Sequence, residues 1–275
     1  MNQSKLFRER EHFDNLKVNP LKFLERDRTP FQRAMIRFLL SRWDGHLKRL
    51  PKEALAGRKV LDACCGNPRI VLWMAAMGAE SFGFDISMGM MTMAGKSGVS
   101  YVLGRKVELC APRWALADCE AMPFPDAAFD TITCFQALHH VDAGRFFSEC
   151  RRVLGPGGLL FITDPNGEHP LRRLGDRIGR SLGLLTRDEG SYSNTQVHKL
   201  LLENGFEIIN SFSMNFFSEI LFLFEEIYRP RRPALSAFIR ASLFFFYPLD
   251  AILDKTLFRV FPSLGWRRVW LAVKK

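Results

Sequence analysis

The sequence predicts an α/β fold built on a doubly wound, seven-stranded, mostly parallel sheet of Rossmann-like topology. Two helical additions are expected, an N-terminal extension and an aromatic-rich insertion before the last strand. The most informative stretch is VLDACCGNP at residues 60–68, where an apolar run ends in an acidic residue and a tight turn leads into a helix. This pattern opens a nucleotide-binding βαβ unit. Later apolar runs alternate with helical periods, which indicates further βα units.

Seven segments have the composition of strands. They are residues 59–63, 81–85, 114–118, 131–135, 159–163, 206–214 and 267–275. The last segment alternates polar and apolar side chains, which suits pairing with the segment before it.

Helices are predicted between these strands. Residues 68–77 follow the first turn, and residues 142–154 carry apolar side chains at a 3.6-residue period. Ser193 and Gln196 have the spacing of a capping box and begin another helix. Residues 165–192 are interpreted as a loop or lid. We divide the chain into an N-terminal helical extension (1–54), a main domain (55–216 and 266–275) and an insertion (217–265).

Acidic residues lie at the ends of three predicted strands. Asp62 closes the first, Asp85 follows 23 residues later at the end of the second, and Asp118 ends the third. In an open α/β sheet, ligands bind beyond the carboxyl ends of the strands, so we expect these carboxylates and Phe135 to converge on one crevice. An acidic residue about 20 positions after the glycine turn suits a pair of ribose hydroxyls.

Taken in order, these segments resemble the class I S-adenosylmethionine-dependent methyltransferases, specifically the small-molecule group that includes quinone-biosynthesis C-methyltransferases. The resemblance rests on the turn at 60–68, Asp85, Asp118 with Cys119, PFPD at 123–126, the His139-His140 pair and RVLGPGG at 152–158. It covers roughly residues 55–164. The first turn departs from the family's glycine pattern at Cys64 and Pro68, which leaves open a degenerate site in a non-catalytic partner protein.

The resemblance implies S-adenosyl-L-methionine as cofactor and gives several residues a role. The turn from Ala63 would approach the methionine end of the cofactor, Asp85 the ribose, and Asp118 the adenine amino group beside the Cys119 amide. Ile86 would pack on the adenine ring, and Phe135 would lie near the sulfonium. The complete expected cofactor set is Asp62, Ala63, Cys64, Gly66, Asn67, Pro68, Asp85, Ile86, Asp118, Cys119, Phe135 and Gln136. No metal site is predicted.

Two adjacent histidines are the candidate catalytic residues. His139 and His140 follow the fourth strand, on the substrate side of the expected crevice. Imidazole titrates near neutral pH, as a general base should. A base is needed only if the acceptor is a hydroxyl, an amine or an acidic carbon, and either histidine could instead cap or pack. His169 and His198 are interpreted as surface residues.

Charge and cysteine content narrow the possible binding partners and the cellular compartment. The net charge is +10, and the basic excess lies in residues 1–60 and 171–275, whereas residues 61–170 carry 8 basic and 12 acidic groups. Basic flanks could contact nucleic acid, anionic lipid or an anionic substrate, or simply be solvated. The six cysteines have no zinc spacing, and a reduced cytosolic compartment fits them best. We therefore expect a cytoplasmic protein, with peripheral contact at the inner membrane surface as an addition.

The insertion is rich in aromatic side chains. The 50 residues from 212 to 261 hold eleven of the 25 phenylalanines, and the run at 243–247 is followed by Pro248, which is expected to interrupt it. A run this short suits an interfacial segment or a hydrophobic lid, not a membrane span. Plain helical packing on the core is the alternative.

Three functions remain open on these residues. Methyl transfer to a small, lipid-like acceptor is favoured by the aromatic density. A nucleic-acid methyltransferase is disfavoured because CFQALHH stands where an Asn/Asp-Pro-Pro-aromatic turn would be expected, and DPNG at 164–167 follows the wrong strand. A non-catalytic partner protein of the same fold is the third.

Overall fold

The computed structural model describes residues 49–66, 69–90, 101–102, 105–106, 113–181, 191–221 and 233–275. Nearly all of the predicted N-terminal extension, and the site candidates Asn67 and Pro68, therefore lie outside the described residues.

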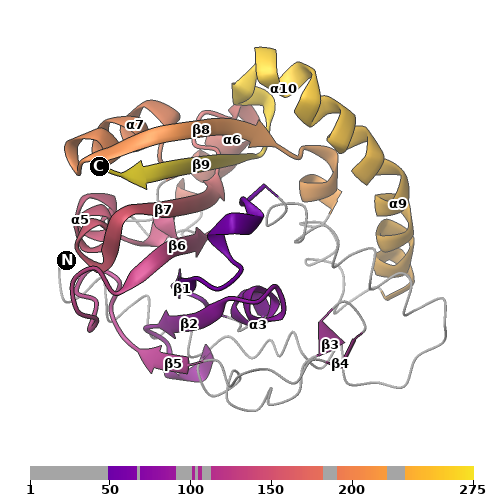
Figure 1. Cartoon of the computed structure of the whole chain (residues 1–275). Coiled ribbons are helices and arrows are strands. Elements are labelled where there is room, and N and C mark those ends of the chain that lie inside the picture. The colour runs from indigo at the N-terminus through magenta and orange to yellow at the C-terminus, as the bar shows by residue number, and fades with distance from the viewer. Residues whose placement is uncertain are drawn as a thin grey trace.

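Seven strands form one sheet, which confirms the predicted fold (Figure 1). They are β1 (Lys59–Ala63), β2 (Glu80–Asp85), β5 (Arg113–Leu116), β6 (Phe129–Phe135), β7 (Leu154–Pro165), β8 (Phe206–Met214) and β9 (Arg267–Lys274). Their order is β5-β2-β1-β6-β7-β9-β8, and β9 runs antiparallel to both neighbours while the other pairs are parallel. A separate two-stranded sheet joins β3 (Tyr101–Val102) and β4 (Arg105–Lys106).

The chain order creates a switch point beside β1. From β1 the chain builds outward through β2 to β5, then returns to place β6 on the other side of β1. Crevices at such a reversal are where open α/β sheets bind ligands. The sheet therefore directs the search for a site to the carboxyl ends of these four strands.

Helix α3 (Arg69–Ala76) covers one face of the sheet, and α5 (Ala143–Val153) and α7 (Asn194–Glu203) cover the other. The other described helices are α6 (Pro170–Ser181), α9 (Pro233–Lys255) and α10 (Leu257–Val260), with 3₁₀ turns η2 (Lys52–Ala54), η3 (Leu138–His140) and η4 (Pro262–Leu264). Alternate strand residues face opposite cores: Phe161 joins the cluster under α3, and Ile162 joins the cluster under α5 and α7. This two-sided burial explains why the parallel strands have nearly continuous apolar sequences.

Capping of two helices follows the local sequence. Asp142 accepts the Arg145 amide at 3.1 Å at the start of α5. Ser193 and Gln196 form the expected capping box at the start of α7, with the Ser193 side chain accepting the Gln196 amide at 3.2 Å. The predictions for both helix starts are therefore confirmed.

Three local predictions were wrong. Residues 170–181, expected as loop, form α6. Pro248 does not interrupt its segment but lies within the 23-residue α9, where it is exposed, so that its ring faces outward. His169, expected on the surface, is 1% exposed and packs against Trp266 with ring centroids 4.9 Å apart.

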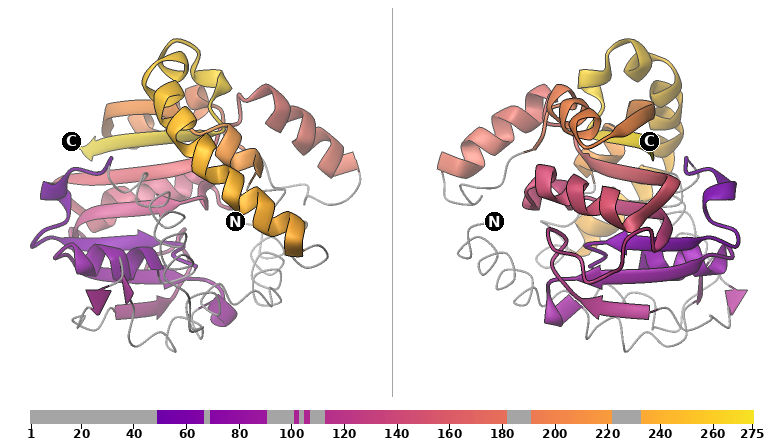
Figure 2. Two further views of the ribbon diagram at one scale, coloured as in Figure 1. Left: turned by 90° about the vertical axis from the view of Figure 1, so that its right-hand side faces the viewer. Right: turned by 60° about the vertical axis from the view of Figure 1, so that its left-hand side comes forward.

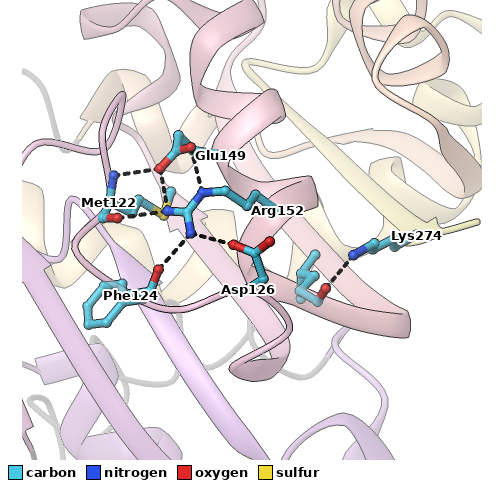
Figure 3. Close-up of polar contacts among 7 residues, drawn as sticks. Met122, Phe124, Asp126, Glu149, Arg152 and Lys274 are labelled. Carbon is cyan, nitrogen blue, oxygen red and sulfur yellow. Dashed lines mark hydrogen bonds and ion pairs between the residues drawn. The ribbon is translucent and has the colours of Figure 1, made fainter.

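Arg152 organises the loop between β5 and β6 (Figure 3). Its guanidinium donates to the carbonyls of Met122 and Phe124 at 2.8 and 2.7 Å, and to the carboxylates of Asp126 and Glu149. The Glu149 carboxylate also accepts the Met122 amide at 2.7 Å. Arg152 lowers the pKa of Glu149 chiefly through this hydrogen bonding. The PFPD segment is thus fixed by one side chain of α5.

Candidate active site at the carboxyl edge of the sheet

Three predicted acidic residues come from three adjacent parallel strands. Asp62 is the penultimate residue of β1, Asp85 the last of β2, and Asp118 lies two positions after β5. The Ala117 amide donates to the Asp85 carbonyl at 3.0 Å, which joins the segments that follow β5 and β2. The structure therefore brings these three segments to one edge of the sheet.

Asp85 is held in place by backbone amides. Its Oδ2 accepts from Gly66 at 2.8 Å and its Oδ1 from Ser87 at 2.9 Å. Gly66 adopts φ +45°, a conformation that favours glycine, and this conformation turns its amide toward the carboxylate. These two amides therefore hold the Asp85 carboxylate at the carboxyl end of β2.

Asp62 is a buried carboxyl with one unused oxygen. Its Oδ1 accepts the Thr133 hydroxyl at 2.6 Å, across the β1–β6 pairing that sets these two residues opposite each other. Its Oδ2 has no hydrogen-bond partner among the described residues. Burial raises the pKa of Asp62 to about 7; the Thr133 hydrogen bond opposes this rise, and the nearby charge of Asp85 adds to it. Asp62 can therefore gain or lose a proton near neutral pH.

Two cysteines connect the first turn to the segment after β5. The thiols of Cys64 and Cys119 hydrogen bond to each other, and this contact together with burial raises the pKa of Cys64 well above its usual value. Both thiols are free. A thiol that stays protonated is a poor nucleophile, so we interpret the pair as a packing contact between the two segments.

The remaining cofactor candidates surround this edge. The Asp118 carboxylate accepts the Glu120 amide at 2.8 Å, in the loop that Arg152 anchors. Ile86 and Phe135 are half-buried, and the Phe135 ring lies 5.7 Å from that of Phe161. Gln136 adopts φ +56° and donates its amide to Thr163 at 2.7 Å, which turns the chain sharply after β6.

The two candidate histidines stand in η3, directly after this turn. Their rings lie 4.0 Å apart. His139 Nδ1 is 2.9 Å from Asp164 Oδ1, and the His139 side chain keeps 15% exposure while Asp164 is buried. A proton on Nδ1, donated to Asp164, leaves Nε2 as the acceptor position. This arrangement can orient an imidazole as a base.

Two of these contacts were missed by sequence reasoning. Asp164 lies near the carboxyl end of β7, and Thr133 lies in β6 beside Asp62. The position of Asp164 at a strand end was a usable signal, because the same rule identified Asp62, Asp85 and Asp118. Thr133 carries no such signal, since a threonine within a strand is ordinary.

The donor and acceptor set fits an adenosyl cofactor. Two fixed carboxylates suit the hydroxyl and amino donors of a nucleoside, and a glycine turn next to them allows close approach of the backbone. The edge also carries a buried carboxyl oxygen without a partner among the described residues, on Asp62.

Comparison with known proteins agrees with this geometry. Residues 61–162 match the family model described as a methyltransferase domain. The predicted resemblance is confirmed over these residues, because they match a methyltransferase domain and S-adenosylmethionine-dependent methyltransferases are among the relatives.

The relatives define how far the likeness extends. A Mycolicibacterium smegmatis protein named as a probable S-adenosylmethionine-dependent methyltransferase is 30% identical over 154 residues, covering 56% of this chain and 53% of the relative. A ubiquinone biosynthesis O-methyltransferase of Idiomarina loihiensis is 31% identical over 155 residues, covering 50% and 61%. The matched part thus spans little more than half the length of these curated relatives.

A likeness in fold to a solved structure extends over nearly the whole chain. The magnesium protoporphyrin IX methyltransferase of Synechocystis, crystallised with S-adenosylhomocysteine, superposes with a TM-score of 0.60 at 18% identity. The superposition covers 98% of this chain and 100% of that one. At this identity the likeness concerns the fold alone.

Proposed function

We propose that this protein transfers a methyl group from S-adenosylmethionine to a small, lipophilic acceptor. The observation that carries the proposal is the convergence of Asp62, Asp85 and Asp118 at the carboxyl ends of β1, β2 and β5, beside the switch point. In this family fold that edge is where the cofactor is expected.

The residues present suggest how the site works. When bound, S-adenosylmethionine supplies an electrophilic methyl group on its sulfonium. Asp85 and Asp118 would hold the ribose and adenine, so that Phe135 and the η3 turn face the reacting end. Most of the rate would come from alignment and exclusion of water, because in-line displacement needs little further chemistry.

His139 is the candidate base for an acceptor that must lose a proton. With Nδ1 donating to Asp164, its Nε2 would take that proton as the acceptor atom bonds to the methyl carbon. His140, whose ring lies against that of His139, would support the orientation of the ring. Both roles are proposals.

A lipophilic acceptor is supported by the aromatic insertion and by the names of the relatives. One curated relative is named for ubiquinone biosynthesis, and a structural neighbour is named as a magnesium protoporphyrin IX methyltransferase.

Among the described residues, none of the helices is long and apolar enough to cross a membrane. We propose a cytoplasmic protein that contacts an anionic membrane at its surface.

Binding of S-adenosylhomocysteine tests the cofactor site. We expect thermal stabilisation of the wild-type protein by this ligand, and none in Asp85→Asn. Asp130→Asn is the matched control, because Asp130 is an acidic residue of the same sheet that lies near the opposite end of β6. Absence of stabilisation of the wild type at high micromolar ligand would instead favour a non-catalytic protein.

Incorporation of labelled methyl groups tests the acceptor. Cell extract divided into lipid and aqueous fractions would be incubated with the enzyme and methyl-labelled S-adenosylmethionine. We expect label in the lipid fraction. Label found only in the aqueous fraction would contradict the lipophilic acceptor but leave methyl transfer intact.

A further inference from the structure

The outward face of α9 is apolar along most of its length. Phe238, Phe245, Leu249 and Ile252 are 71%, 74%, 38% and 60% exposed, and their spacing of 7, 4 and 3 residues places them on one side of the helix. Val260 and Phe261, at the end of α10, which packs against α9, are also 70% and 53% exposed. A surface helix of a globular protein usually shows the opposite pattern, with polar side chains outward.

Acidic side chains on the inward face fix this orientation. Asp250 is 1% exposed and accepts the amides of Phe216, Phe217 and Ser218 at 3.1, 3.1 and 2.9 Å. The Asp254 carboxylate accepts the Asn215 amide at 2.8 Å. Rotating α9 to bury its phenylalanines would break all four hydrogen bonds. The apolar face is therefore held outward by the segment that follows β8.

The charges exposed beside this face are cationic. Lys255 and Arg259 are exposed, whereas the carboxylates of Asp250 and Asp254 are turned inward. Figure 2 (left) shows α9 on the side of the sheet where the parallel strands end, with α6 on the same side. The α6 helix also exposes about half of Leu171, Leu174 and Ile178. Apolar side chains next to exposed cations are the composition of a helix that lies in a membrane interface.

We propose that the outer face of α9 and α10, defined by Phe238, Phe245, Leu249, Ile252, Val260 and Phe261, docks on an anionic phospholipid bilayer. The inference rests on the proposed function, because a lipophilic acceptor would reside in that bilayer. Lys255 and Arg259 complement the negative surface of such a membrane. A second copy of the chain is a poorer occupant, because a two-fold pairing of this face would bring its cations near those of the other copy.

Vesicle cosedimentation tests this surface on the full chain. The probes are vesicles of phosphatidylcholine alone and of phosphatidylcholine with phosphatidylglycerol. We expect binding to the second kind only, weakened by salt because exposed charges are screened. The Phe238→Glu/Phe245→Glu variant should bind about tenfold or more weakly, because each change removes an inserted ring and adds a negative charge. Leu202→Glu is the matched control, since Leu202 is 60% exposed on α7.

The outcomes separate this inference from the proposed function. Wild-type affinity in the double phenylalanine variant, or equal binding to neutral vesicles, would overturn the docking surface. So would a dimer in light scattering that the same variant makes monomeric, because a second copy would then occupy the face. Stabilisation by S-adenosylhomocysteine should be unchanged in this variant. If S-adenosylhomocysteine does not stabilise the wild type, the proposed function is refuted. The vesicle experiment would then still show whether the α9 face binds membranes.

Discussion

Replacing Asp62 by asparagine should change how stability depends on pH. The Asp62 pKa is raised by burial to about 7 from an ordinary value of 3.8. Between these values the folded protein holds a proton that the unfolded chain has lost, so wild-type stability falls as the pH rises toward 7. The interval from pH 5 to the folded-state pKa is about 2 pH units, and each unit lowers the free energy of unfolding by about 1.4 kcal/mol. The wild type therefore loses about 3 kcal/mol of stability above pH 5. Asparagine does not ionise, so the variant does not lose this stability as the pH rises.

Urea unfolding at a series of pH values measures the effect. We expect the free energy of unfolding of Asp62→Asn, relative to wild type without ligand, to rise by about 3 kcal/mol between pH 5 and pH 9. Subtracting the free energies of unfolding of the two proteins removes the contribution of groups that titrate alike in both. A difference that stays constant over this range would show that Asp62 is ionised throughout, and the account of its burial would be wrong.

The remaining predictions concern the loop anchor and the histidine. Arg152→Ala should lower the free energy of unfolding in urea by about 2–4 kcal/mol, because it removes the guanidinium donor from two loop carbonyls and leaves the Glu149 carboxylate with the Met122 amide alone. Arg145→Ala, at an exposed helix position, should cost less than about 1 kcal/mol. His139→Gln should lower kcat about 100-fold without weakening cofactor binding, and Asp164→Asn should lower it less while shifting the pH profile of kcat. Wild-type kcat in both variants would show that alignment alone suffices.

The sequence predicted the cofactor half of the fold well. The strand segments, the switch point and the acidic strand ends all depend on local patterns, and strands that alternate with helices must align their carboxyl ends. Asp62 and Asp85 could therefore be placed at one edge of the sheet from the sequence alone. Asp164 was overlooked although the same rule applied, because its partner His139 is 25 residues away and their contact requires the β6–β7 pairing.

The segments around the expected acceptor side were predicted poorly, and long-range contacts explain why. Residues 165–192 were interpreted as a loop or lid, with arginines among small apolar residues. Residues 170–181 instead form a helix, in which Arg172 contacts Ser191 and Asp176. In α9 the outward face is apolar, and the inward face buries Asp250 beside Ile239 and Leu243. Asp250 is buried because it binds amides more than 30 residues away, at 216–218.

The inward aspartates have a consequence for the energetics of α9. A polar group without its partner is costly to bury, so the inward aspartates are tolerated only while the 215–218 amides meet them. The same bonds, together with the burial of Ile239 and Leu243, leave two phenylalanines facing out. An exposed apolar surface fixed by buried polar bonds is thus a built feature, and such surfaces mark sites of interaction with proteins or membranes. The fold therefore specifies the α9 face as firmly as it specifies the carboxyl edge of the sheet.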